Sequence, residues 1–121
     1  ELLITVHGYA DLLVATILTF KPTILYQSPM ISAVNKLSGL PLSDPTPPAA
    51  RGFNQAIASM VAAIGIGQIV GAKAGPVMRT TFVSMYAVWG ILSLATCLTD
   101  MGSATVLFSG INHSVFAGVV Y

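Results

Sequence analysis

Two ionisable side chains lie close together in the first apolar stretch of this sequence. His7 and Asp11 are four residues apart in the run from Leu2 to Phe20, so they share one face if that run is a helix. Apolar surroundings disfavour the charged form of a carboxyl group unless a donor compensates it, which is how a general acid or base is made. The pair therefore indicates a place where a proton could be transferred or a polar ligand group could be bound.

A second set of polar side chains lies in the last apolar run of the sequence. Thr105, Ser109 and Asn112 form one stripe at helical spacing, and His113 follows Asn112 directly. Each polar residue is costly in such a run and needs a partner, a cavity or water. We therefore expect this stripe and the first pair to face the interior of the protein.

Three chemical interpretations of these residues remain open. In an enzyme, a carboxylate, an imidazole, an amide and a phenol in one dry pocket could protonate an olefin, activate water on an epoxide or isomerise a polyketide or terpenoid. The candidate catalytic residues are then Asp11, His113, Tyr86 and Asn112. In a pigment-binding protein, a neutral imidazole or, more weakly, an amide oxygen could ligate the metal of a tetrapyrrole. The candidate ligands are His7, His113, Asn112 and Gln68. In a purely structural bundle, the same residues would satisfy one another across helices.

The sequence argues against several other functions. The two histidines are far apart, and no cysteine or third ligand lies at metal-site spacing beside either, so a structural zinc site is not indicated. Five basic and four acidic residues are scattered singly, which leaves no basic patch for a nucleic acid. Two or three ionisable groups at staggered depths do not make a proton relay across a whole membrane.

The elements that must position these side chains are membrane-spanning helices. Hydrophobic residues make up 55% of the chain, charged residues 7%, and the mean hydropathy is +0.82. The apolar runs are close to the roughly 20 residues that a helix needs to cross the hydrocarbon core. We predict an all-α integral membrane protein, a four-helix up-down-up-down bundle, because short connections between the last three helices make neighbours antiparallel. Residues 1–121 form one transmembrane domain, with helices at about residues 2–20, 52–70, 77–98 and 103–121.

The first two predicted helices are joined by a long connection, residues 21–50, which holds six of the seven prolines. Within it, Ser28-Pro29 looks like a helix cap followed by proline at the first helical position, and Gly39 looks like a helix end. The apolar residues between them fall on one face: Met30, Ile31, Val34 and Leu37. We predict a short helix at the membrane interface, which either covers the end of the bundle or closes a pocket as a lid.

Rows of small residues predict where helices approach closely, because lipid gives no hydrophobic drive for helix to pack on helix. The predicted second and fourth helices carry such rows at a spacing of four: Ser59, Ala63, Gly67, Gly71 and Gly75, and Gly110, Ser114 and Gly118. We expect these rows to pack within the bundle or onto a neighbouring subunit, with a platform for a ring-shaped ligand as the alternative.

A further polar group is expected at the opposite end of the bundle from His7. Arg51 and Asn54 open the second predicted helix and Asp100 ends the third. An ion pair between Arg51 and Asp100 is therefore geometrically permitted.

Several short motifs over about residues 38–121 resemble those of a known family. The motifs are Ser38-Gly39-Leu40-Pro41, Ala50-Arg51-Gly52, Asp100, and His113 followed by Ala117-Gly118. They are similar to a family of small microbial four-helix membrane proteins of unknown function and, more distantly, to the DoxX family. The resemblance implies a four-helix membrane fold and a joint role for Arg51, Asp100 and His113, but no substrate. This chain has Asn54-Gln55 where that family would have an acidic residue.

We expect an accessory, structural or small-molecule-binding subunit of a larger membrane protein complex, with a lipid, quinone or pigment as ligand. Its partners are then the lipid bilayer and other membrane subunits, and not a nucleic acid. The alternative is a small membrane-embedded hydrolase, isomerase or cyclase that uses Asp11 and His113 for acid–base chemistry on a lipophilic metabolite. The chain begins with Glu1 instead of methionine, which would fit a removed presequence and an organelle inner or thylakoid-type membrane.

Overall fold

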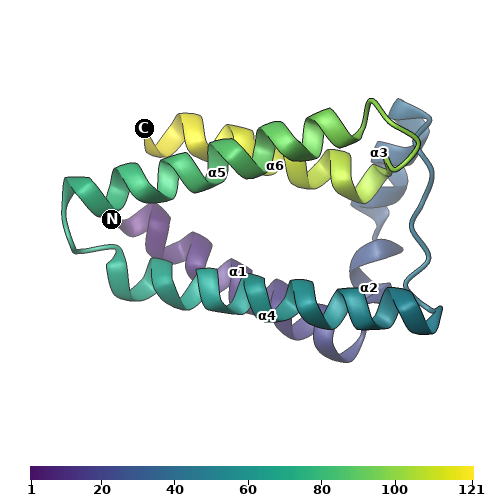
Figure 1. Ribbon diagram of the computed structural model, residues 1–121, viewed down its shortest axis with the longest axis horizontal. Coiled ribbons are helices and arrows are strands. Elements are labelled where there is room, and N and C mark those ends of the chain that lie inside the picture. The colour runs from purple at the N-terminus through teal and green to yellow at the C-terminus, as the bar shows by residue number, and fades with distance from the viewer. The chain divides into compact units, whose positions relative to one another are not determined.

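The computed structural model describes residues 1–121, and its regular structure is entirely helical (Figure 1). The helices are α1 (Leu2–Phe20), α2 (Thr23–Tyr26), α3 (Pro29–Ser38), α4 (Pro48–Gly71), α5 (Pro76–Thr96) and α6 (Ala104–Val120). Three of them, α1, α4 and α5, are long and apolar enough to cross a membrane, and α6 is a shorter apolar helix. The prediction of an all-helical chain with several apolar, membrane-type helices is confirmed, while the up-down-up-down arrangement stays a prediction.

Two of the long helices differ from their predicted bounds. α4 begins at Pro48, four residues before the predicted start, with Pro47 as its N-cap. Proline is well suited to the first turn of a helix, because the N–H that it lacks has no partner there in any case. α5 ends at Thr96, two residues before the predicted end.

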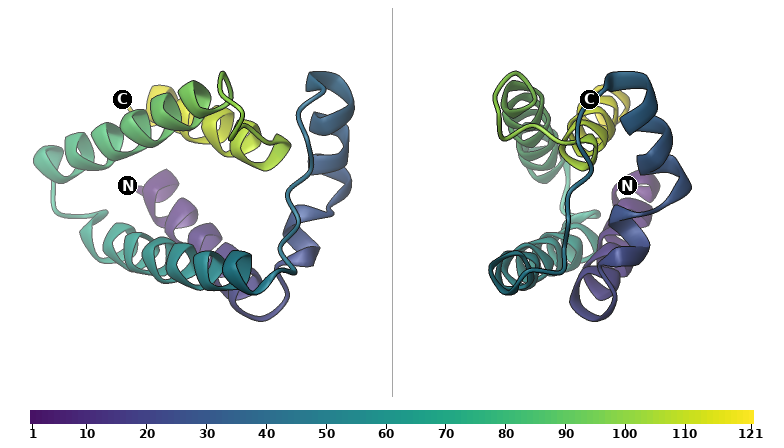
Figure 2. Two further views of the ribbon diagram at one scale, coloured as in Figure 1. Left: turned by 45° about the vertical axis from the view of Figure 1, so that its right-hand side comes forward. Right: turned by 90° about the vertical axis from the view of Figure 1, so that its right-hand side faces the viewer.

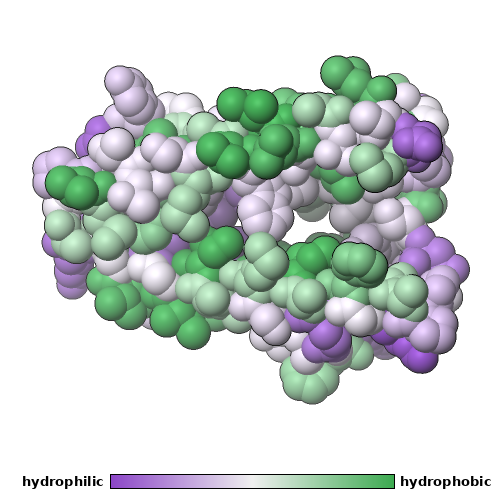
Figure 3. All heavy atoms as spheres, in the orientation of Figure 1, coloured by the Kyte–Doolittle hydropathy of each residue, from purple (hydrophilic) through white to green (hydrophobic).

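The chain forms two compact units. Unit 1 consists of residues 1–25 and 44–79 and contains α1 and α4, and unit 2 consists of residues 26–43 and 80–121 and contains α3, most of α5, and α6. Large apolar side chains are exposed on α4 and α5, for example Phe53 and Val70 on α4 and Ile91 and Leu92 on α5. Figure 3 shows apolar side chains gathered over α4 and over α5. Such faces suit lipid better than water.

In unit 1, α1 and α4 pack against each other in antiparallel directions. Near one end, the side chain of Gln55 donates to the backbone carbonyl of Thr19 at 2.9 Å. Nearer the other end, a Cβ on Gly8 would lie 2.7 Å from the carbonyl oxygen of Gly65, and a Cβ on Gly65 would lie 2.7 Å from the carbonyl oxygen of Gly8. The two backbones therefore touch at a point that only glycine permits on either side.

The small-residue row predicted on α4 does not make this contact. Ser59, Ala63 and Gly67 are exposed, and a Cβ on Gly67 would meet nothing within 4 Å. Gly71, the next residue of that row, is buried. α1 lies against the face of α4 that carries Gly65, and Gly67 is not in that contact. Of the two predicted packings of this row, the one onto a neighbouring subunit stays a prediction.

In unit 2, α5 and α6 also form an antiparallel pair with close contacts. A Cβ on Gly110 would lie 3.0 Å from the side chain of Leu94, and a Cβ on Gly90 would meet both the side chain and the backbone of Ser114. Gly110 and Ser114 from the predicted row on the last helix thus lie in the contact. Gly118 has open space at its Cβ position, so its packing onto a neighbouring subunit, the other form of the prediction, stays a prediction.

The short helix expected within the long connection is α3. The hydroxyl of Ser28 accepts a hydrogen bond from the backbone N–H of Ile31 at 3.3 Å, which caps the N-terminus. Gly39 has a φ of 72°, a left-handed conformation that ends the helix and that glycine adopts without strain. Ile31 is 1% exposed, and α3 packs against α6 within unit 2.

Candidate functional site

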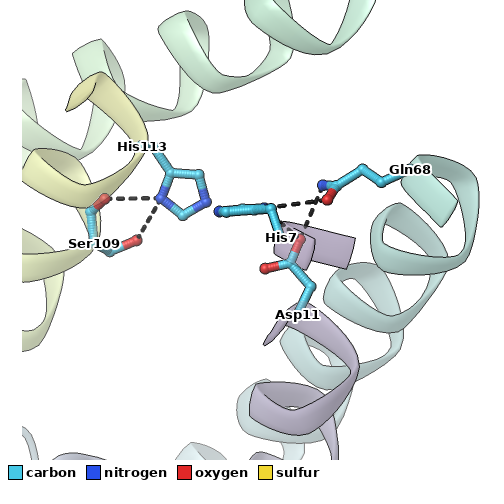
Figure 4. A network of polar contacts seen from close by, with 5 residues as sticks. All are labelled: His7, Asp11, Gln68, Ser109 and His113. Atoms are coloured by element: carbon cyan, nitrogen blue, oxygen red, sulfur yellow. Dashed lines mark hydrogen bonds and ion pairs between the residues drawn. The ribbon is translucent and has the colours of Figure 1, made fainter. Parts of the chain in front are cut away.

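Three polar side chains of unit 1 form one hydrogen-bonded group (Figure 4), here called the unit 1 cluster: His7, Asp11 and Gln68. Nδ1 of His7 lies 3.1 Å from Oε1 of Gln68 and 3.3 Å from Oδ2 of Asp11. Nε2 of Gln68 donates to the same carboxylate oxygen at 2.9 Å. His7 is 6% exposed and Gln68 is fully buried, whereas the side chain of Asp11 keeps 14% of its surface. The cluster is thus closed except at the edge of its carboxylate.

The local structure explains why these three residues meet. His7 and Asp11 lie one helical turn apart on α1, as their spacing predicts. Gln68 comes from α4, and its position depends on the glycine contact, because Gly8 follows His7 directly and Gly65 lies three residues before Gln68. A Cβ on Gly65 would lie only 3.1 Å from the Cβ of Asp11. The close approach of the two backbones therefore delivers the Gln68 amide to the histidine and the carboxylate.

The contacts of the cluster determine where the histidine holds its proton. Two acceptor oxygens, from Gln68 and Asp11, lie beside Nδ1 of His7, so a neutral imidazole carries its hydrogen on Nδ1. Nε2 is then the ring nitrogen that carries the lone pair and whose proton content changes on titration. A carboxylate orients histidines in this way in hydrolase triads and in metal sites.

A second polar group, the unit 2 cluster, consists of Tyr86, Trp89, Ser109 and His113. Nδ1 of His113 donates to the backbone carbonyl of Ser109 at 2.8 Å, and Nε1 of Trp89 donates to the Ser109 hydroxyl at 3.0 Å. The rings of Trp89 and His113 are stacked, with centroids 5.1 Å apart and planes 21° apart. Tyr86, which is 2% exposed, lies with its ring centroid 6.2 Å from that of His113. His113 is therefore held by the Ser109 carbonyl, with the Ser109 hydroxyl 3.4 Å from the same Nδ1, and by two aromatic neighbours.

Some of the predicted site residues lie elsewhere. Asp11 belongs to unit 1 and His113 to unit 2, so their predicted partnership stays a prediction. Asn112 is exposed, contrary to the expectation that it faces inward. It lies roughly 100° around the helix from His113, and it is His113 that contacts α5. The amide oxygen of Gln68 contacts His7, which leaves that oxygen poorly suited to ligate a tetrapyrrole metal.

The polar group that was predicted at the opposite end of the bundle from His7 has members in both units. Arg51, which is exposed, and Asn54, which is buried, are in unit 1, and Asp100, which is exposed, is in unit 2. The Arg51–Asp100 ion pair and the joint role of Arg51, Asp100 and His113 stay predictions.

Two roles that the structure shows were not expected from the sequence. Gln68, predicted as a candidate ligand, links His7 and Asp11. Trp89, the only tryptophan, was not singled out, although a signal for its place existed. The turn between α5 and α6 is centred at Asp100. Trp89 and Ser109 lie at similar distances on either side of it, so they come close together in an antiparallel hairpin.

Comparison with family models, with curated proteins and with solved structures finds no match to this chain. The resemblance to small four-helix membrane proteins therefore stays a prediction.

Proposed function

We propose that this chain is a multi-pass membrane protein that binds the polar group of a lipophilic small molecule at the unit 1 cluster, as a subunit of a larger membrane assembly. The ligand classes that fit are a lipid, a quinone or a pigment. α1, α4 and α5 have the length and hydropathy to cross the bilayer. α6, with 17 residues, lies at the lower limit of about 17 residues for a spanning helix.

The observation that carries this proposal is the place of Asp11. It lies at the middle of the α1 sequence, where a carboxyl group is costly in a membrane and needs a strong reason to be there. Packing does not supply that reason, because the contact between Gly8 and Gly65 already brings α1 and α4 together. Two partners support the carboxylate, and its remaining edge can be reached. This arrangement favours a ligand contact over a purely structural hydrogen bond.

The outward row on α4 supports the second part of the proposal. Ser59, Ala63 and Gly67 are exposed at a spacing of four residues. Rows of small residues let the backbone of a second helix approach closely in a membrane. A helix of another subunit would therefore fit this face of α4.

One observation favours an enzyme as a second candidate. The Asp11 carboxylate lies 3.3 Å from Nδ1 of His7, so it would stabilise the imidazolium that forms when Nε2 takes up a proton. Such a pair could act as general base and acid in a hydrolase, isomerase or cyclase with a lipophilic substrate. In this version His7 takes the place that was predicted for His113. Asn112, being exposed, is no longer the residue expected to orient the substrate.

The substitution Asp11→Asn tests the proposed function and separates its two forms. Loss of the carboxylate should lower the amount of lipophilic molecule that co-purifies with the protein by about tenfold or more, because a charged hydrogen bond contributes roughly 1.5–3 kcal/mol. The measurement is mass spectrometry of solvent extracts, normalised to protein and run beside size-exclusion chromatography of the detergent-solubilised assembly.

The matched control is Asp44→Asn, which removes an exposed carboxylate in the connection between α3 and α4. It should leave both the extract and the assembly unchanged. Retention of the molecule by Asp11→Asn, with loss of turnover of that molecule, would favour the enzyme. Retention with no change in any activity would contradict both versions.

A further inference from the structure

α3 carries apolar residues on two opposite sides, and only one of these sides is covered. α3 packs against α6, and Ile31 is 1% exposed, whereas Met30 is 56% and Leu37 is 89% exposed. At roughly 100° per residue, the exposed residues of α3 fall on the half of the helix opposite Ile31, except for Ser38 at its C-terminal end. This outer face of α3 consists of Pro29, Met30, Ala33, Lys36 and Leu37.

Within unit 2, α3 lies at the turn end of the α5–α6 hairpin. The backbone N–H of Ala104, the first residue of α6, donates to the carbonyl of Pro41, just after α3, at 2.9 Å. Figure 2 shows α3 running across the direction of α6 and not along it. If α5 and α6 cross the bilayer, their turn lies at its surface. Figure 2 (right) shows α3 beside α6, so at this level α3 lies parallel to the surface with the side opposite α6 turned away from the hairpin.

The charge of this part of the chain matches an anionic lipid surface. Residues 26–43, the part of unit 2 that contains α3, hold no aspartate or glutamate, and Lys36 is their only charged residue. Lys36 is exposed. Lys36 lies at the edge of the outer face, where its long side chain can reach headgroups while its methylene groups stay beside the apolar residues.

We infer that α3 is a surface helix whose outer face inserts into the boundary between headgroups and acyl chains of an anionic bilayer, with Lys36 contacting the headgroups. Met30, Ala33 and Leu37 supply the apolar contact, as in other helices that lie in the plane of a membrane. This lipid-binding surface belongs to unit 2, and the inference does not depend on what the unit 1 cluster binds. It also opposes the lid interpretation, in which the outer face would be open to water.

The insertion can be measured with a fluorophore on a single cysteine. Leu37→Cys in a Cys97→Ser background is labelled and reconstituted into phosphatidylcholine vesicles with phosphatidylglycerol. A nitroxide at carbon 5 of the lipid chains should quench the label strongly, and aqueous iodide should quench it at least about threefold less than a label at Thr46→Cys, an exposed loop position. Ala33→Cys is a second position on the same face, for use if Leu37→Cys does not fold. A label as open to iodide as that at Thr46, or one shielded from both quenchers by a protein partner, would overturn the inference.

The headgroup contact has its own test. Lys36→Gln should lower the ratio of inserted to free α3 about fivefold in vesicles with phosphatidylglycerol, since a basic residue at an anionic surface contributes roughly 1 kcal/mol. In vesicles of phosphatidylcholine alone it should have little effect. Lys73→Gln, an exposed lysine between α4 and α5, is the matched control and should not change the ratio. Equal effects of the two substitutions would overturn the role of Lys36.

Discussion

Replacement of Gly65 by alanine should lower the free energy of unfolding by about 3 kcal/mol, at the upper end of the usual cost of overpacking. The added methyl group would lie 2.7 Å from the carbonyl oxygen of Gly8 and 3.1 Å from the Cβ of Asp11. Neither atom is the end of a flexible side chain, so the helices themselves must move apart. Unfolding by SDS in mixed micelles, followed by pulse proteolysis, measures the change.

The matched control is Gly67→Ala, two residues along the same helix. Its Cβ would meet nothing within 4 Å, so the free energy of unfolding should change by less than about 0.5 kcal/mol. Gly8→Ala should act like Gly65→Ala, because it meets the same contact from the α1 side. Equal stability of Gly65→Ala and Gly67→Ala would show that α1 and α4 do not cross at these glycines.

Replacement of Gln68 by leucine should lower the free energy of unfolding by about 2 kcal/mol and should also reduce the amount of co-purified lipophilic molecule. Leucine is similar in size to glutamine, so the substitution mainly removes hydrogen bonds. Asp11 loses a donor at 2.9 Å and His7 loses an acceptor at 3.1 Å, and hydrogen bonds to a charged group contribute roughly 1.5–3 kcal/mol each. The same SDS titration and the same extract analysis give both results.

Gln55→Leu makes the same chemical change on the same helix at an exposed position, where the amide reaches only the Thr19 carbonyl. It should lower stability by less than about 0.5 kcal/mol and leave the extract unchanged. Equal stability of Gln68→Leu and Gln55→Leu would show that the hydrogen bonds of Gln68 to His7 and Asp11 do not stabilise the fold.

The helices of this chain could be predicted from hydropathy and local signals, because both depend on neighbouring residues alone. α1 has the predicted bounds, and α3 lies between the expected cap at Ser28 and the expected end at Gly39. The pairing of His7 with Asp11 also follows from sequence, since residues four apart in a helix must share a face.

The partner of that pair could not be predicted, because it depends on which face of α4 meets α1. Gly67 and Gly71 belong to a regular row of small residues, whereas Gly65 stands in no such row. Spacing alone therefore favours the face of α4 that carries Gly67 and Gly71 as the contact, whereas α1 lies against the face that carries Gly65. The contact is decided by Gly8, the only glycine in α1, since two backbones can touch only where both helices lack a side chain.

The surroundings of His113 were missed for a related reason. The prediction placed Asn112 and His113 together in an inward stripe, but adjacent residues of a helix point about 100° apart. Stacking of His113 on Trp89 turns His113 toward α5 and leaves Asn112 exposed. If α5 and α6 are paired as antiparallel helices about their short turn, the sequence predicts that Trp89 lies near Ser109 and His113.

If the unit 1 cluster holds the polar group of a lipophilic molecule, that molecule should stay with the wild-type protein during purification from its native membrane. The protein is extracted in a mild detergent, its absorption spectrum is recorded, and mass spectrometry identifies and quantifies what co-purifies. We expect a lipid, quinone or pigment at about one molecule per chain, together with partner subunits. A colourless, solitary protein with no molecule bound in a fixed ratio would show that the cluster does not bind such a ligand.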